Sequence, residues 1–173
     1  MAAHVGPKNF AEAMRSDTAE KWMGAMDVEM KSIKKHNTWD LMPLPKNSKV
    51  VDSRWVFNKK EGGIYKARFC AKGFTQRWGE DYEETFAPVV KYTSIRTLIA
   101  LAAGGNFEIH QMDVITAFLN SNLKETVYVR QPAGYEVPGK EHWVCKLNRA
   151  LYGLKQSGRA WFDEIALALI EFD

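Results

Sequence analysis

The sequence predicts an α+β fold built around antiparallel strands, and three patterns support this class. Residues 17–36 carry apolar side chains at helical spacing, and so do residues 157–172 near the end of the chain. Between them, residues 51–72 alternate apolar and polar side chains on either side of a glycine pair, as the strands of a hairpin do. Helices set against antiparallel strands are typical of α+β domains, and 173 residues suffice for one domain or two small subdomains.

The composition is that of a globular protein, because 46% of the residues are hydrophobic and 12% are aromatic. The net charge of +3 permits nucleic-acid binding without arguing for it. The two cysteines are far apart and the four histidines are scattered, so neither a zinc site nor a disulfide framework is expected. The longest apolar run, residues 98–103, is too short to span a bilayer, and residues 1–10 lack the pattern of a signal peptide. We therefore expect an intracellular chain that is not secreted.

The first expected helix covers residues 17–36. Asp17 followed by Glu20 predicts a capping box at its start, and Asn37 predicts its end. Four apolar residues define its buried stripe, namely Trp22, Met26, Met30 and Ile33. The prolines in the following "TWDLMPLP" predict an extended segment, because they forbid a helix there.

A β-hairpin is expected from two strands, residues 51–59 and 64–72, around the turn "EGG". Its apolar face consists of alternate residues, namely Val51, Trp55, Phe57, Tyr65, Ala67, Phe69 and Ala71. The opposite face is basic and contains Lys59, Lys60, Lys66, Arg68 and Lys72. Cations at this spacing can follow a phosphate backbone, although a solvated outer face is the plainer explanation of the charge pattern alone.

The second half of the chain begins with a helix expected over residues 93–105, ended by its two final glycines. Residues 107–115 are predicted to follow as a strand that is buried on at least one face. A second strand pair is expected at residues 126–132 and 142–147. The last helix, residues 157–172, would take Ser157 as its N-cap. Its inner stripe would consist of Trp161, Ile165, Ala168 and Phe172.

Two short segments carry weaker chemical signals. The turn "LYGLKQSG" leads into the last helix, where free N–H groups favour anions, but one glycine and one lysine do not make a phosphate loop. Asp113 is the one carboxylate in the mostly apolar "HQMDVITAFLN". Because an ionised carboxylate is costly to bury alone, it must reach solvent, pair with a cation or bind a metal ion. From this stretch alone a cap of the following turn is the plainer interpretation, and metal ligation is the alternative.

Several long phrases of the sequence occur together in the order of a known family. They are "WVFNKKEGGIYKARFCAKGFTQRWGEDYEETFAPVVKYTSIRTLIALAA", "IHQMDVITAFLNSNLKETVYVRQPAGY" and "VCKLNRALYGLKQSGRAWF". They closely resemble the reverse transcriptase in the Pol polyprotein of copia-type LTR retrotransposons. The segment "KWMGAMDVEMKSIKKHNTWDLMPLP" is similar to the N-terminal part of that domain. The resemblance runs from about residue 8 to the end of the chain.

The resemblance implies a partial right-hand polymerase fold, with a fingers hairpin and part of an antiparallel palm sheet with flanking helices. It divides the chain into an N-terminal helix and extended segment at about 8–50, the fingers hairpin and loop at 51–92, and a partial palm at 93–173. The family's aromatic–hydrophobic–Asp–Asp hairpin, its thumb and its ribonuclease H region are absent from this sequence. Gly158 also stands where the family usually has proline, which would weaken the start of the last helix.

The resemblance also implies roles for matching residues. Asp113 matches the first catalytic aspartate, which binds two Mg²⁺ ions, and the backbone carbonyl of Val114 would be a further metal ligand. Phe118 matches the aromatic residue that lies under the sugar and selects deoxynucleotides. The remaining nucleotide-binding residues would be Lys66, Arg68, Lys72 and Tyr152. The residues placed against template and primer would be Gly153, Lys155 and Ser157.

The expected function is that of an RNA-directed DNA polymerase domain fragment, which would meet an RNA template, a DNA primer and dNTP in a cytoplasmic virus-like particle or the nucleus. Two cations held about 3.5–4 Å apart need more anionic ligands than one aspartate and one carbonyl. The chain alone is therefore expected to be inactive and to bind Mg²⁺ at most weakly. Two alternatives stay open, a non-catalytic nucleic-acid-binding module and an inert transposon relic. A truncated palm is also expected to self-associate.

Overall fold

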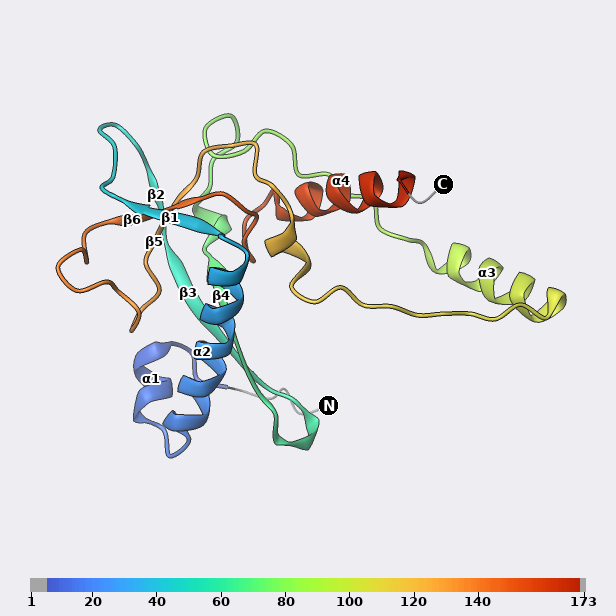
Figure 1. Cartoon of the computed structure of the whole chain (residues 1–173), viewed down its shortest axis with the longest axis horizontal. Coiled ribbons are helices and arrows are strands. Elements are labelled where there is room, and N and C mark those ends of the chain that lie inside the picture. Colours follow the sequence, from blue (N-terminus) through green and yellow to red (C-terminus); the bar gives the residue numbers. More distant parts are fainter. Residues whose placement is uncertain (1–5, 172–173) are drawn as a thin grey trace.

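A computed structural model describes residues 6–171 and confirms a mixed α+β architecture. The helices of this range are α1 (Phe10–Arg15), α2 (Ala19–Lys35), α3 (Tyr92–Gly105) and α4 (Ser157–Ile170). The strands are β1 (Trp39–Met42), β2 (Val50–Val51), β3 (Ser53–Lys59), β4 (Tyr65–Ala71), β5 (Tyr128–Arg130) and β6 (Val144–Leu147). In Figure 1, α1 and α2 lie beside the hairpin β3–β4, the other strands gather near its upper end, and α3 lies far out at the right. None of the helices in residues 6–171 is both long and apolar enough to cross a membrane.

The strands form two sheets, and the predicted hairpin and the predicted second strand pair are both confirmed. Strands β3 and β4 pair antiparallel with Trp55 opposite Phe69. The other sheet has the order β1-β6-β5-β2, in which β6 pairs antiparallel with β1 and β5. Its edge strand β2 pairs parallel with β5, so this sheet is mixed. The extended segment expected after the first long helix is β1.

The N-terminal helices differ from the prediction in how they are capped. The predicted capping box of Asp17 and Glu20 is wrong, because α2 begins at Ala19 after Thr18, which makes no side-chain cap hydrogen bond. A capping arrangement does exist one helix earlier, where the Asn9 side chain accepts a 2.9 Å hydrogen bond from the backbone N–H of Glu12. It starts α1, a helix that the apolar pattern did not predict. The four residues of the predicted α2 stripe are all buried.

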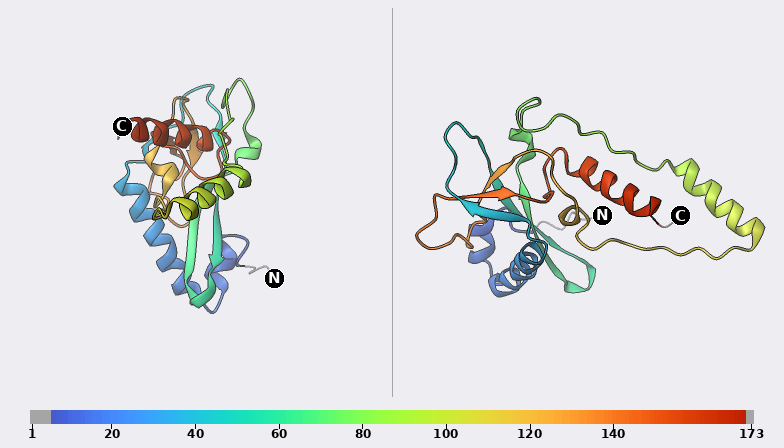
Figure 2. Two further views of the ribbon diagram at one scale, coloured as in Figure 1. Left: turned by 90° about the vertical axis from the view of Figure 1, so that its right-hand side faces the viewer. Right: turned by 45° about the horizontal axis from the view of Figure 1, so that its top comes forward.

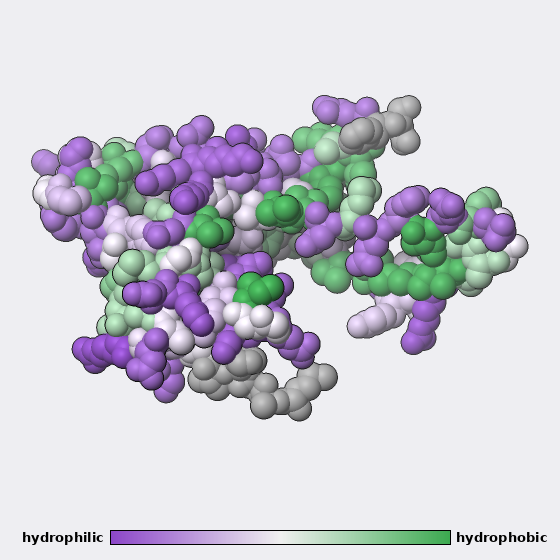
Figure 3. Space-filling view, turned by 60° about the horizontal axis from the view of Figure 1, so that its bottom comes forward, coloured by the Kyte–Doolittle hydropathy of each residue, from purple (hydrophilic) through white to green (hydrophobic). Residues whose placement is uncertain are grey.

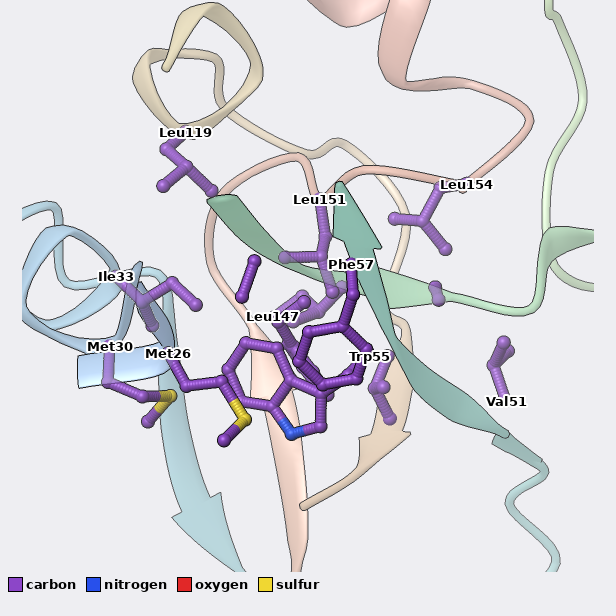
Figure 4. Packing of buried hydrophobic residues seen from close by; sticks show 14 of the residues in the cluster. Met26, Met30, Ile33, Val51, Trp55, Phe57, Leu119, Leu147, Leu151 and Leu154 are labelled. Carbon is purple, nitrogen blue, oxygen red and sulfur yellow. The ribbon is translucent and has the colours of Figure 1, made fainter. Parts of the chain in front are cut away.

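The core lies between α2, the apolar face of the hairpin and the mixed sheet (Figure 4). Met26 and Ile33 of α2 face the aromatic side chains of β3, which Trp55 and Phe57 supply. The Trp55 ring centroid lies 5.6 Å from that of Phe69 on the opposite strand. The indole N–H of Trp55 donates to the Ala133 carbonyl at 2.9 Å, so this buried polar group has a partner. Alternating burial therefore fixes which face of the hairpin points outward.

The helix α3 and residues 106–116 form an arm that projects from this core, as Figures 1 and 2 show. The predicted helix is confirmed, but its glycines are helical and its left-handed C-cap is Asn106 (φ 53°). The predicted strand at residues 107–115 is wrong, because that segment is exposed and makes no ladder with any described strand. Its apolar residues change from one face, at Phe107 and Ile109, to the other, at Met112 and Val114. A strand also needs a neighbouring backbone to accept and donate its hydrogen bonds.

The last helix α4 also departs from its prediction in two respects. Ser157 is the first helical residue rather than the N-cap, which is Gln156. The Ser157 hydroxyl instead donates to the Leu151 carbonyl at 2.6 Å and is buried. The predicted inner stripe is only half-buried at Trp161 and Ile165 and is exposed at Ala168, while Phe172 lies outside the described residues. The stripe lacks a covering element within residues 6–171, so helical spacing did not translate into burial.

We expect the chain to self-associate through the arm. Exposed apolar side chains cover it, among them Tyr92, Ile95, Leu98, Ile99, Leu101, Phe107, Ile109, Met112, Val114 and Ile115. Figure 3 shows hydrophobic side chains gathered on this projecting part of the molecule. Monomeric proteins rarely expose contiguous apolar patches larger than a few hundred Å². Sedimentation velocity at rising protein concentration should show increasing mass.

Two double variants test this prediction, one with two glutamates on the arm and a control with two glutamates on α2. Leu98→Glu with Leu101→Glu should shift the equilibrium toward monomer, because both residues are exposed on α3. Lys31→Glu with Lys35→Glu introduces the same side chains on the exposed face of α2 and should leave the association unchanged. A wild-type chain that stays monomeric at every concentration would contradict this prediction.

Candidate nucleotide and nucleic-acid site

Two cations project from the outer face of β4. Lys66 and Arg68 are exposed, whereas the residues that alternate with them are buried or half-buried, so strand geometry puts both on one face. Their neighbours across the hairpin are Asn58 and Val56, and neither is acidic. Burial lowers the pKa of Lys66, and the charges of Arg68 and Lys60 lower it further, against smaller opposing effects of Glu29 and Asp113. A group of cations whose own repulsion lowers a lysine pKa favours a bound anion.

Arg68 lies at one end of a stack of three side chains from three separate segments. Its guanidinium carbon lies 5.2 Å from the centroid of the Tyr152 ring. The Tyr152 ring in turn lies 5.2 Å from that of Phe118, with the two planes at 58°. Phe118 belongs to the short 3₁₀ helix Ala117–Asn120, which the fully buried Leu119 anchors in the core. We call Arg68, Tyr152 and Phe118 the stack.

The turn that carries Tyr152 is fixed to the end of β4 through its backbone. The Ala71 N–H donates to the Tyr152 carbonyl at 2.8 Å. Gly153 follows with φ at +87°, and a Cβ atom there would lie 2.2 Å from the Ala71 carbonyl oxygen. Only glycine fits both this conformation and this close approach. The sequence "LYG" therefore places an aromatic ring beside the basic face of the hairpin.

A network of amide side chains holds the next part of the same turn. The Gln76 side chain donates to that of Gln156 at 3.1 Å and accepts from the Lys155 backbone N–H at 2.9 Å. Gln156 in turn donates to the Asp81 carbonyl at 3.0 Å. Both amides are buried and paired, as buried polar groups must be to avoid a desolvation cost. These hydrogen bonds thus hold the turn against the loop of residues 73–82.

Three of the predicted site residues already have partners within the protein. Lys72 lies 3.7 Å from the Asp52 carboxylate, which also accepts a 2.7 Å hydrogen bond from Arg130. The hydrogen bond from Arg130, with a smaller contribution from Lys72, lowers the pKa of Asp52. Lys155 donates to the Tyr82 hydroxyl at 3.0 Å, and the buried Ser157 hydroxyl donates to the Leu151 carbonyl. Lys66 and Arg68 are therefore the less neutralised cations beside the stack.

Residues 36–173 match the family described as reverse transcriptase (RNA-dependent DNA polymerase). The chain belongs to this family. It is 47% identical over 161 residues to the retrovirus-related Pol polyprotein from transposon TNT 1-94 of Nicotiana tabacum, which covers 90% of this chain. It is 42% identical over 176 residues to the Pol polyprotein from transposon RE2 of Arabidopsis thaliana, and this match covers 98% of the chain. The truncated transposon Ty1-A Gag-Pol polyprotein of Saccharomyces cerevisiae is 34% identical over 160 residues, or 88% of this chain.

The chain spans only a small part of the length of these relatives. The aligned part amounts to 12% of the tobacco and Arabidopsis polyproteins and 13% of the yeast one. No solved structure matches the chain.

The described residues do not fit a two-metal centre. Asp113 and Val114 lie on the exposed arm. Within residues 6–171, no three His, Cys, Asp or Glu side chains come together in a way that could hold a metal ion. Two adjacent divalent ions need several carboxylate oxygens, so Asp113 and one carbonyl do not supply the ligand set. The Asp113 charge does reach the hairpin, where it has a small effect on Lys66.

Sequence reasoning missed one residue that borders this site, Glu29 of α2. It is buried with only 7% of its surface exposed, and its carboxylate accepts a hydrogen bond from the Phe69 N–H of β4 at 3.3 Å. A signal for it was present, because Glu29 falls three residues after Met26, on the apolar side of the helix. A carboxylate in a buried stripe requires an explanation.

Proposed function

We propose that this chain supplies the nucleotide- and nucleic-acid-holding part of a reverse transcriptase domain of the retrotransposon type. The observation that carries the proposal is the stack of Arg68, Tyr152 and Phe118 beside Lys66. Aromatic rings contact bases and sugars, while guanidinium and ammonium groups contact phosphates, so this combination suits a nucleotide within a strand or as a triphosphate. Family membership supports the same conclusion.

The roles within the proposed site are those that family membership implies for the matching residues. Lys66 and Arg68 hold phosphate, and Phe118 lies under the sugar. Tyr152 lies between Arg68 and Phe118 and contacts both. Lys72 contributes less because Asp52 already neutralises it in part. Gly153, Lys155 and Ser157 support the template side through the conformation of their turn. The hairpin and its loop act as fingers and residues 93–173 as part of the palm of a right-hand fold.

We further propose that this polypeptide alone does not polymerise DNA. Chemistry at the primer hydroxyl would need two Mg²⁺ ions, and the described carboxylates do not form the necessary ligand set around Asp113. No catalytic step is therefore assigned to this chain. Its action is to bind and orient nucleic acid, which is also what the alternative of a non-catalytic binding module requires.

One experiment with two readouts tests this proposal. The chain is mixed with an RNA–DNA hybrid with a recessed primer end, and binding and primer extension are measured at several salt concentrations with Mg²⁺ or Mn²⁺. Binding that weakens steeply with salt and no extension of the primer are expected. Template-dependent extension would exclude the proposed inactivity. Absence of binding at low salt would exclude the binding function.

A further inference from the structure

The buried carboxylate of Glu29 lies directly behind the proposed nucleic-acid site. Glu29 is on the face of α2 that packs against β4, between the buried residues Met26 and Ile33. An ionised carboxylate is costly in such a place, and an apolar side chain of similar size would pack there without that cost. No ion pair of the described residues includes Glu29. Its presence is therefore not explained by stability.

The hydrogen bond of Glu29 explains part of its placement. Its carboxylate accepts from the Phe69 N–H, and the Ala71 N–H two residues later donates to the Tyr152 carbonyl. Backbone N–H groups of residues two apart on a strand point to the same side, so both bonds lie on one edge of β4. Helix α2 and the Tyr152 turn are therefore held to the same strand edge, one on each side of Cys70. Arg68 immediately precedes the first of these two anchor points.

The charge of Glu29 acts on the site through space. Burial raises the pKa of Glu29, while the Phe69 N–H and the charges of Arg68 and Lys66 lower it. Burial raises the pKa of Tyr152 most, and the charge of Glu29 raises it further, whereas Arg68 lowers it. The charge of the same carboxylate also acts to raise the pKa of Lys66 and of Cys70, so it affects several side chains of β4. An ionised Glu29 therefore opposes any phosphate held by Lys66 and Arg68.

We propose that Glu29 is a positioning residue of the nucleic-acid site. Its hydrogen bond fixes the edge of β4 beside the stack, and its negative charge weakens the binding of phosphate by Lys66 and Arg68. The inference rests on the proposed function and adds to it a residue that contacts no ligand. The two roles can be separated, because the hydrogen bond and the charge respond differently to substitution. Glutamine keeps an oxygen acceptor and loses the charge, whereas methionine loses both.

The test measures binding of an RNA–DNA hybrid by the full chain at low salt. Glu29→Gln should bind about three- to tenfold more tightly than wild type, the range expected for one charge acting through partly screened protein. Glu29→Met should bind more weakly than Glu29→Gln, because the Phe69 N–H then lacks its acceptor. Glu20→Gln is the matched control, since it makes the same change at an exposed position of the same helix and should leave affinity unchanged.

The pH dependence distinguishes a charge effect from general structural damage. Phosphodiesters do not titrate between about pH 5 and 7, so the hybrid keeps its charge over that range. Because the pKa of Glu29 is raised, wild-type affinity should increase as pH falls and Glu29 takes up a proton. The Glu29→Gln variant should lack that component. An NMR titration of labelled tyrosines should also show a lower pKa for Tyr152 in this variant.

The outcomes separate this inference from the function on which it rests. A wild-type chain that does not bind the hybrid would overturn both together. Wild-type binding with an unchanged affinity and pH profile in Glu29→Gln would overturn the inference alone. An unchanged Tyr152 titration in that variant would overturn it as well.

Discussion

The Gly153→Ala variant is expected to lose about 3–5 kcal/mol of folding free energy, from a strained backbone and an unavoidable close contact. Gly153 has a φ of +87°, which alanine adopts only with strain. The added Cβ would also lie 2.2 Å from the Ala71 carbonyl oxygen. That oxygen cannot move aside freely, because the Ala71 N–H is bonded to the Tyr152 carbonyl and its strand is paired with β3. Separation of the turn from β4 would displace Tyr152 from Arg68.

Chemical denaturation followed by tryptophan fluorescence measures this loss. Gly139→Ala is the matched control, because Gly139 has a φ of +76° but a Cβ added there would find nothing within 4 Å. It should cost about 1 kcal/mol, the conformational part alone. Equal losses in the two variants would show that the contact between Gly153 and Ala71 does not hold the turn.

The double variant Lys66→Ala with Arg68→Ala is expected to weaken binding of an RNA–DNA hybrid about a hundredfold at low salt. Both side chains face solvent on β4 without an acidic neighbour across the hairpin, so each is free to contact a phosphate. Loss of two phosphate contacts should also reduce the slope of log affinity against log salt by about 1.8. Fluorescence anisotropy with a labelled hybrid over a range of salt gives both quantities.

Two comparisons identify the cause of that loss. Lys31→Ala with Lys35→Ala removes the same charge from the exposed face of α2 and should change affinity little. Lys72→Ala should weaken binding less than Lys66→Ala or Arg68→Ala alone, because Asp52 lies 3.7 Å from the Lys72 amine and neutralises it in part. Similar losses in the α2 control would show that net charge, rather than the face of β4, governs binding.

Periodic segments of this chain were predictable because their own side chains carry the signal. The hairpin β3–β4 alternates apolar and polar residues, and α2 repeats apolar residues at helical spacing, so each specifies its buried face locally. The segment 107–115 lacks such a consistent period, and it is not a strand, because its hydrogen bonds depend on a partner that the described residues do not provide. The misplaced caps at Asp17 and Ser157 have a similar origin, since several polar residues near a helix start can serve as caps and local packing selects one.

Long phrases in a fixed order identify the family from the amino-acid sequence, and they also give the residue types available for chemistry at each motif. The sequence also predicts that Lys66 and Arg68 share a face, because that follows from the period of a strand. The contacts that join Arg68, Tyr152 and Phe118 in one stack, and the position of Glu29 behind them, came from the three-dimensional packing. Contacts between distant segments depend on how the core packs and on where backbones approach closely, as at Gly153, and no local pattern encodes that information.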